Sequence, residues 1–314
     1  MTPGAPGAWD SAYHAPVLAD EIASLFEGAK SVLDCTLGGG GHSAALLALG
    51  ANVTAIDRDP QAIEEAKKRL AAHAAAGRFH AILGNFAEID TLLPDKSQKF
   101  DGILADLGVS SHQIDDAERG FSFREGAPLD MRMNSTALMS AADLLATEPE
   151  EELVRIFREY GDEPKARRLG REVVRRRENR AFRTSDDFVG AIRAVLGPRS
   201  GPGDFARLFQ ALRIAVNDEI GSLERALPAL RDRLEPNGVL AVIAYHSGED
   251  RIVKHAMRDW SRDCICPPRQ PSCTCRGRSL GALVMRKSVT AASEETSRNP
   301  RARSARLRAW RKEG

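Results

Sequence analysis

The sequence of 314 residues predicts an α/β fold: a parallel, doubly wound sheet with a helical insertion. Three observations predict it. Short apolar runs alternate with helical patterns up to residue 105, and four glycines, Gly38 to Gly41, follow the first of these runs. The stretch 112–207 then shows helical patterns only, and a further apolar run appears at 238–245. Because the strand pattern resumes after this stretch, the helices are expected to form an insertion between two parts of one sheet domain.

The first part of the chain is expected to alternate between strands and helices. Pro60 suits the first position of a helix, where its fixed φ is favourable and no N–H is needed. The expected elements are strands at 31–37, 52–56, 79–83 and 100–105 and helices at 16–27, 43–49 and 60–75. Ligands of such sheets bind beyond the carboxyl ends of the strands, so residues that follow these strands should meet in one crevice.

The later part is expected to contain the insertion and the end of the sheet. Amphipathic patterns predict helices at 153–160, 166–177, 188–196 and 205–226, and a strand at 238–245. The predicted domains are therefore a discontinuous sheet domain, 12–111 with 208–314, and an inserted helical domain, 112–207.

Bulk composition indicates a soluble globular protein, with 42% hydrophobic and 28% charged residues. No apolar run is long enough for a membrane span and residues 1–9 lack a signal-peptide core, so a cytoplasmic protein without membrane contact is expected. The net charge of +1 hides two basic stretches. Residues 165–183 hold nine basic and two acidic residues, and residues 298–314 hold seven and one. Each indicates either a nucleic-acid surface or a solvated face or disordered tail.

The strand–glycine–helix unit around Gly38 to Gly41 is typical of a cofactor site. Glycines remove Cβ atoms that would keep a ligand from the backbone, and the following helix presents its N-terminal N–H groups. Asp57 ends the second strand, where α/β nucleotide folds hold ribose hydroxyls. Together these features predict a cofactor with an adenosine part. The alternative is a glycine-rich turn that binds no ligand.

The pattern of the loop favours S-adenosylmethionine among such cofactors. The dinucleotide fingerprint needs a glycine where Ser43 stands, and the phosphate-loop pattern needs a lysine that this loop lacks. An acid near the end of the first strand, Asp34, and Asp57 after the second suit a ligand with a ribose and a zwitterionic tail but no phosphates.

Nine motifs give the sequence a specific resemblance. They are His14 to Leu18, Asp34 to Ser43, Ile56 to Pro60, Asp101 to Ser111, Arg119 to Phe123, Pro128 to Met133, Phe209 to Glu219, His246 to Lys254 and Asn299 to Ser304. From His14 to about Trp310 the chain resembles the bacterial 16S ribosomal RNA cytosine-N4 methyltransferase family. The resemblance implies a Rossmann-like class I methyltransferase sheet, S-adenosylmethionine as cofactor, and a cytidine near the decoding centre of 16S rRNA in the small ribosomal subunit as substrate.

The resemblance also implies which residues bind the cofactor. Gly40, Gly41 and His42 would border its methionine part, Asp57 would hold the ribose, and Phe86 would pack on the adenine. Asp106 and Gln113 occupy further positions that the family uses for the cofactor. The sequence departs from the family at His112, where proline is usual. It also departs at Ala244 and Tyr245, which replace Ser-Phe, and at Gly248, which replaces Leu.

Methyl transfer to N4 sets requirements that point to candidate catalytic residues. The N4 lone pair is delocalised into the ring, so the site must align the amine and accept its hydrogen bonds. Asp106, after the fourth strand, could supply the accepting carboxylate, although a role in cofactor binding alone is the other interpretation. Tyr245, Phe121 or Phe123 could stack on the base, and His246 follows Tyr245 in the same motif. The inserted helical domain, with its basic stretch at 165–183, is expected to bind the RNA.

Four of the five cysteines form a compact group, Cys264, Cys266, Cys273 and Cys275. Four thiolates suit a tetrahedral structural zinc, although the Cys-x-Cys spacing is tighter than usual. The alternative is a surface loop with reduced cysteines. Cys35 lies in the first strand and is expected to pack in the core.

Three other functions remain open at this point. A methyltransferase could act on another RNA, on DNA or on a small molecule, although the basic stretches disfavour the last. A nicotinamide-dependent oxidoreductase is disfavoured by the failed dinucleotide fingerprint. A non-enzymatic ribosome-assembly factor with a cofactor fold is disfavoured by the intact glycine loop and Asp57.

Overall fold

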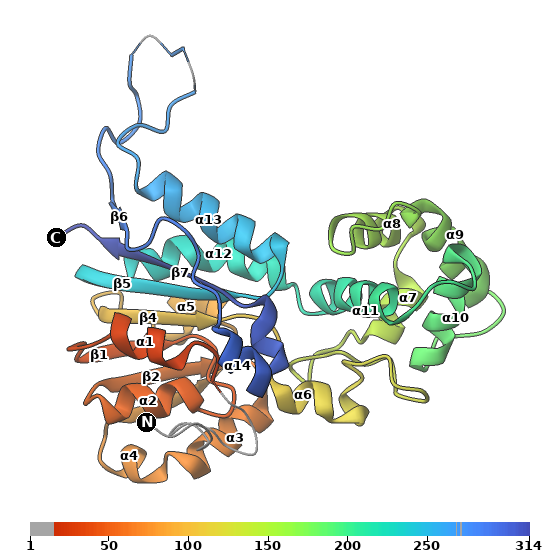
Figure 1. Cartoon of the computed structure of the whole chain (residues 1–314), viewed down its shortest axis with the longest axis horizontal. Coiled ribbons are helices and arrows are strands. Elements are labelled where there is room, and N and C mark those ends of the chain that lie inside the picture. The colour runs from red at the N-terminus through yellow and green to blue at the C-terminus, as the bar shows by residue number, and fades with distance from the viewer. Residues whose placement is uncertain (1–15, 268, 271) are drawn as a thin grey trace. The chain divides into compact units, whose positions relative to one another are not determined.

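The computed structural model describes residues 16–267, 269–270 and 272–314 (Figure 1). The prediction that residues 1–9 lack a signal-peptide core concerns residues outside these ranges. His14, the first residue of the first motif, also lies outside them. The chain forms two compact units. The sheet unit comprises the chain up to Gly108 and from Gly221 onward, and the helical unit comprises Val109 to Ile220. None of the described helices combines the length and the apolarity that a bilayer span needs.

The sheet unit is built on seven strands in the order β3-β2-β1-β4-β5-β7-β6. The first five pair in parallel, and β7 runs antiparallel to β5 and to β6. The strand order reverses between β1 and β4, which is where doubly wound sheets open a crevice for ligands. The bounds are β1 Ser31–Asp34, β2 Asn52–Asp57, β3 Phe79–Leu83, β4 Phe100–Asp106, β5 Leu234–Ala244, β6 Gly281–Leu283 and β7 Arg306–Lys312.

Helices cover both faces of this sheet, so its central strands are buried on both sides (Figure 1). Alternate residues of β1 show the division, because Val32 packs in one core and Leu33 in the other. One face is covered by α1 Ala19–Leu25, α2 Gly41–Ala48 and α3 Pro60–Arg69, and α4 Ala71–Ala75 follows α3. The other face is covered by α5 Ile89–Leu92, α12 Glu219–Asp232 and α13 Ser247–Trp260. The remaining elements are α14 Ser293–Arg298 and the short 3-10 helices η1 Phe86–Glu88 and η3 Pro300–Ser304.

The helical unit has a hydrophobic core of its own. Phe188 lies at its centre, stacked on Phe157 with ring centroids 5.8 Å apart and tilted against Phe209 at 5.4 Å. The helices are α6 Ser111–Asp115, α7 Ala141–Thr147, α8 Glu150–Glu159, α9 Ala166–Arg177, α10 Ser185–Leu196 and α11 Pro202–Val216, with the 3-10 helix η2 Ala117–Arg119 after α6. The predicted α/β fold with a Rossmann-like sheet is confirmed by this architecture.

The prediction of one continuous helix at 205–226 is wrong, because the structure has two helices there, α11 and α12. Asp218 between them has φ 47°, a left-handed conformation that Asp tolerates better than most residues. Asn217 fixes the break. Its Nδ2 donates to the Met131 and Arg213 carbonyls, and its Oδ1 accepts from Met133 N at 2.8 Å. Because α11 packs in the helical core, the helical unit ends at residue 220 and the sheet unit resumes at residue 221. The sequence had predicted this boundary between residues 207 and 208.

The basic stretch at 298–314 is an ordered part of the sheet unit, in contrast to a disordered tail. Leu307, Ala309 and Trp310 of β7 are buried, and the Trp310 ring meets Trp260 edge-on at 5.2 Å. Arg308 pairs with Asp250 of α13 through two hydrogen bonds of 2.7 and 3.0 Å. The strand was not predicted because basic residues interrupt its apolar pattern.

Candidate active site

Three acids end three neighbouring strands at the carboxyl edge of the sheet: Asp34 on β1, Asp57 on β2 and Asp106 on β4. The sequence had placed them together, and the parallel register of these strands brings them to one edge. Burial raises the pKa of Asp57 and of Asp106 to about 6, and it raises the pKa of Asp34 as well. The edge therefore concentrates negative charge in a poorly solvated place.

The glycine loop connects β1 to α2 and owes its glycines to both geometry and packing. Gly38 and Gly40 have φ of 49° and 74°, which favour glycine. A Cβ on Gly41 would lie 3.0 to 3.2 Å from three atoms of Pro16, so this position is filled by protein. A Cβ on Gly38 would meet no atom of the described residues within 4 Å. The space that glycine leaves free for a ligand therefore lies at Gly38 and not at Gly41.

Asp57 holds the loop in place. Its Oδ2 accepts a hydrogen bond from Gly38 N at 2.7 Å, and its Oδ1 accepts one from Asp59 N at 2.8 Å. Each oxygen keeps a further acceptor site, since a carboxylate oxygen can accept two hydrogen bonds. The carboxylate is thus oriented by the backbone and can still accept from a ligand hydroxyl.

Asp34 and Thr36 join the ends of β1 and β4. Asp34 is fully buried and accepts from Ser43 Oγ at 2.7 Å and from Thr36 N at 3.1 Å. The hydroxyl of Thr36 in turn accepts from Asp106 N at 2.7 Å. These bonds fix the backbone of Asp106 relative to the glycine loop.

The carboxylate of Asp106 lies between Tyr245 and His42. Its Oδ1 accepts from the Tyr245 hydroxyl at 2.8 Å, and its Oδ2 lies 3.7 Å from His42 Nδ1. His42 Nε2 lies 2.9 Å from the Val17 carbonyl, which can only accept, so Nε2 carries a proton. The side chain of Asp106 is 10% exposed, and burial followed by the neighbouring Asp106 raises the pKa of Tyr245 well above its usual value. Tyr245 is therefore a hydrogen-bond donor here and remains protonated.

His246 and Glu249 shape the turn from β5 into α13. His246 Nδ1 accepts from the N–H groups of Gly248 and Glu249 at 3.2 and 3.4 Å and caps the helix. Glu249 Oε2 accepts from Tyr245 N at 2.9 Å and from His246 N at 3.3 Å. His246 Nε2 is 3.2 Å from Glu249 Oε1. The ring of His246 thus has a structural role in this turn, and its catalytic role stays a prediction.

Phe86 and Gln113, the other predicted cofactor residues, lie in different units. Phe86 begins η1 directly after β3 and is half-buried against the core that holds α12. Gln113 lies in α6 of the helical unit and is buried, and its Oε1 accepts from Ser110 N at 3.0 Å in a capping box. Its contact with a cofactor stays a prediction.

The acids at the carboxyl edge suit S-adenosylmethionine better than a dinucleotide. The pKa of Asp57 and of Asp106, raised first by burial, is raised further by Asp34. A ligand that brings positive charge relieves this repulsion, and a ligand that brings phosphates adds to it. S-adenosylmethionine carries a sulfonium and an ammonium group. The residues present therefore fit this cofactor.

Comparison with known proteins assigns the family. The family model described as "MraW methylase family" matches residues 11–313. The chain belongs to the MraW methylase family. A Ribosomal RNA small subunit methyltransferase H from Gemmatimonas aurantiaca is 60% identical over 313 residues, 99% of both chains. The protein of the same name from Heliobacterium mobile is 42% identical over 96% of this chain and 99% of its own, and that from Anaeromyxobacter sp. (strain K) is 47% identical over 95% and 97%.

Three residues that shape the site were not predicted from the sequence. Thr36, Ser43 and Glu249 were not singled out as site residues, yet each holds part of the acidic edge. Glu249, three residues after His246, matches only half of the capping-box signature, whose first residue is usually Ser, Thr, Asp or Asn, so the signal for this turn in the sequence is weak. Thr36 gives no such signal, because its partner, Asp106, is 70 residues away.

The motif Arg119 to Phe123, one candidate for handling the base, is mainly structural in the helical unit. Arg119 is buried, and its Nη2 donates to the carbonyls of Arg132 and Met133 at 3.0 and 2.9 Å. Gly120 has φ 69°, and a Cβ there would lie 2.2 Å from the Pro128 carbonyl oxygen. Phe123 is 36% exposed and remains available to a partner.

Replacing Asp106 by Asn should remove a pH-dependent destabilisation of the folded protein. The pKa of Asp106 is about 6 when folded, above the value of about 3.9 in an unfolded chain. The folded state therefore binds more protons between these values, and stability is lost as the pH rises through them. The unfolding free energy of Asp106→Asn minus that of wild type should therefore increase by roughly 1–3 kcal/mol when the pH is raised from 4 to 7.5. Urea unfolding followed by the fluorescence of Trp260 and Trp310, both in the sheet unit, measures this difference.

The control is Glu64→Gln, since Glu64 is 70% exposed and pairs with Lys68 on the surface of α3. Its difference from wild type should be nearly the same at both pH values. If the difference in unfolding free energy between Asp106→Asn and wild type is also the same at both pH values, Asp106 is not a buried carboxylate with a raised pKa.

Proposed function

We propose that the protein transfers a methyl group from S-adenosylmethionine to the exocyclic N4 amine of a cytidine in 16S ribosomal RNA near the decoding centre. The relatives that match over nearly their whole length carry the name Ribosomal RNA small subunit methyltransferase H, which supports the RNA substrate and a cytoplasmic site of action. The choice of cytidine N4 rests on the resemblance of the motifs. The structural observation that carries the chemistry is the buried Asp106 carboxylate, oriented by Tyr245 at the carboxyl edge of the sheet.

Asp106 is suited to accept hydrogen bonds from the N4 amine. One of its oxygens is engaged by the Tyr245 hydroxyl, and the other has His42 Nδ1 at 3.7 Å, beyond hydrogen-bond distance. That second oxygen can therefore accept from an amine, which draws electron density back to the nitrogen. Bound S-adenosylmethionine supplies the electrophilic methyl group. As the methyl group passes from sulfur to N4, Asp106 would accept the proton that the amine loses and pass it on to water.

The glycine loop and the neighbouring strand ends would hold the cofactor. Gly40, Gly41 and His42 would border its methionine part, and Asp57 has free acceptor sites for the ribose hydroxyls. Phe86 follows β3 and is half-buried against the core of the sheet unit, a position that suits packing against the adenine. These assignments follow the family resemblance, and the orientation of Asp57 by two backbone N–H groups supports the one made for Asp57.

The helical unit would bind the RNA through the basic face of α9. A cytidine in structured RNA must leave its stack to be methylated, and that costs a few kcal/mol, which contacts elsewhere must offset. A cavity of about 310 Å³ lies at the end of α9. Its lining residues are Arg175, Arg176, Asn179, Arg180, Ala181, Phe182 and Asp187. Three guanidinium groups suit a phosphate, whereas the Phe182 ring is buried in the helical core.

Mass mapping of 16S rRNA tests the proposed reaction. In cells that lack this protein, the decoding-centre cytidine should lose the mass of one methyl group, and the wild-type gene should restore it. An Asp106→Asn gene should not restore it. A cytidine that stays fully methylated without the protein would contradict the proposal, and restoration by Asp106→Asn would exclude Asp106 as the necessary acceptor of the amine proton.

Removing the Tyr245 hydroxyl should shift the pH dependence of methyl transfer. Burial raises the pKa of Asp106 to about 6, while the hydrogen bond from Tyr245 lowers it. Since a protonated Asp106 cannot accept the amine proton, the rate should fall as the pH drops through this value. In Tyr245→Phe the acidic limb should move to higher pH, by up to about one unit. The measurement is kcat/KM against pH with small-subunit particles as substrate.

The matched control is Tyr160→Phe, which removes a hydroxyl that pairs with Arg155 in the helical unit. Its acidic limb should coincide with that of wild type. If Tyr245→Phe lowers the rate equally at every pH, Tyr245 does not act through the ionisation of Asp106.

Neutralising two arginines of α9 should weaken RNA binding without changing cofactor affinity. Arg175 and Arg176 both pair with Glu172, at 2.8 and 2.7 Å, so reversing their charge would leave three acids within one helical turn. The double change Arg175→Gln and Arg176→Gln avoids this. The slope of log K against log salt should decrease by roughly 0.7 for each phosphate that the variant no longer neutralises. Binding of 16S rRNA in a salt titration and binding of S-adenosylhomocysteine by calorimetry measure the two effects.

A matched double change in the sheet unit, Lys67→Gln with Lys68→Gln, removes two exposed cations from α3. It should leave the salt slope unchanged. An unaltered slope for the α9 variant would exclude α9 from the RNA-binding surface.

A further inference from the structure

The four cysteines 264, 266, 273 and 275 converge in space as well as in sequence. Their sulfur atoms all lie within 4.8 Å of one another. The closer pairs are Cys273 with Cys275 at 3.4 Å, with Cys264 at 3.8 Å and with Cys266 at 3.9 Å, and Cys264 with Cys275 at 3.9 Å. A tetrahedron of thiolates around zinc, with bonds of about 2.3 Å, has edges of about 3.8 Å. Four of the six sulfur–sulfur distances are therefore close to the edges of such a tetrahedron, and the other two are at most 4.8 Å.

The described part of the loop that carries them has no hydrophobic core. It connects α13 to β6, and no residue described between 261 and 280 is buried. Its base is tied to the sheet unit, where Leu280 N donates to the Trp260 carbonyl at 2.8 Å. Figure 1 shows the loop extending away from α13 and β6 without any helix or strand of its own. A segment without a hydrophobic core gains order from a metal or a covalent link.

We propose that Cys264, Cys266, Cys273 and Cys275 bind one zinc ion that fastens the α13–β6 loop. The set is closed, because four thiolates complete a tetrahedral shell and leave no position for water or substrate. The ion is therefore structural and takes no part in methyl transfer.

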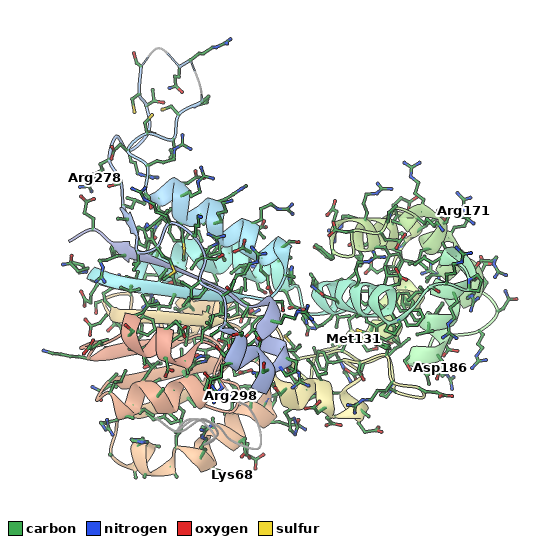
Figure 2. All side chains as sticks on the ribbon, in the orientation of Figure 1. Lys68, Met131, Arg171, Asp186, Arg278 and Arg298 are labelled. Carbon is green, nitrogen blue, oxygen red and sulfur yellow. The ribbon has the colours of Figure 1, made fainter. Side chains whose placement is uncertain are left out.

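Groups around the cysteines favour a thiolate cluster. Ile265 N donates to Cys275 Sγ at 3.4 Å, as backbone N–H groups commonly do toward metal-bound sulfur. Gln270 Nε2 donates to the Ser272 carbonyl at 3.0 Å and to Thr274 Oγ1 at 2.8 Å, which braces the turn between the two cysteine pairs. Zinc with four thiolates carries two negative charges. The loop holds four arginines against one acid, Asp263; they are Arg262, Arg269, Arg276 and Arg278, the last labelled in Figure 2.

The position of the loop in the sheet separates this site from the acidic edge. Strand β6 is antiparallel to β7, which is antiparallel to β5, so β6 runs in the direction of the parallel strands. The loop enters β6 at its first residue, Gly281, and therefore lies toward the amino ends of these strands. Asp34, Asp57 and Asp106 lie at the carboxyl ends. Loss of the metal should consequently leave binding of S-adenosylhomocysteine unchanged.

Metal analysis of the purified full chain tests the proposal. Wild type, purified without chelator and without an affinity tag that binds metals, should contain one zinc per chain. Cys266→Ser and Cys273→Ser should each lose it, and cobalt loaded in its place should show the visible absorption bands of tetrahedral thiolate coordination in wild type only. Trypsin should cleave after Arg269 faster in the two variants, or in chelator-treated wild type, than in the zinc-loaded protein.

Two controls separate the site from general damage to the loop or loss of any thiol. Ser272→Ala changes one atom within the same loop, and Cys35→Ala removes the buried cysteine of the sheet unit. Both should keep one zinc per chain. Wild type with no metal, with iron in place of zinc, or with disulfides among the four cysteines by mass spectrometry would overturn the proposal. So would full zinc content in both serine variants.

Discussion

The position of Asp106 depends on contacts from three different segments of the sheet unit. Thr36, just after β1, accepts from its backbone N–H, Tyr245 after β5 donates to its carboxylate, and His42 at the start of α2 lies beside it. The parallel register of β1, β4 and β5 is what brings these segments to one edge. Since each contact crosses between strands, the geometry of the site is a property of the whole sheet and not of any single motif.

This arrangement places several carboxylates where water solvates them poorly. Burial raises the pKa of Asp34, Asp57 and Asp106, and Glu249, also buried, adds to the effect at Asp106. Such a cluster disfavours the folded state at neutral pH unless hydrogen bonds and a positively charged ligand compensate. The backbone donors at Asp57 and the hydroxyls at Asp34 and Asp106 supply part of this compensation. A positively charged ligand would supply the remainder.

The two units carry opposite charges at the places where the proposed ligands would bind. The sheet unit presents the acids, whereas α9 of the helical unit ends in Arg175, Arg176 and Arg177. Part of this basic charge serves the unit itself, because Arg177 donates to the carbonyls of Leu145 and Glu148 and Arg175 pairs with Glu172. A count of basic residues therefore overstates the charge that a nucleic acid would meet. The same holds for the C-terminal stretch, where Arg308 is committed to Asp250.

The sequence by itself determined the alternation of strands and helices, the glycine turn and the acids after β1, β2 and β4. Each of these depends on local patterns, namely apolar runs, glycine conformations and residues at strand ends. It also drew attention to the four cysteines, whose spacing is a property of a short segment. Helix α9 was predicted with the limits that the structure shows, because its apolar residues keep helical spacing between its charges.

Only the tertiary structure decided which of these residues act together and in what role. The break at Asn217 depends on the Met131 carbonyl and the Met133 N–H, both more than 80 residues away, and β7 depends on pairing with β5. His246 proved to cap α13, and Arg119 proved to brace the helical unit, because their partners are set by packing. The glycine loop shows the same limit. Its conformation is local, but which of its glycines leaves room for a ligand depends on where Pro16 and Leu70 pack, and that is decided by contacts distant in the sequence.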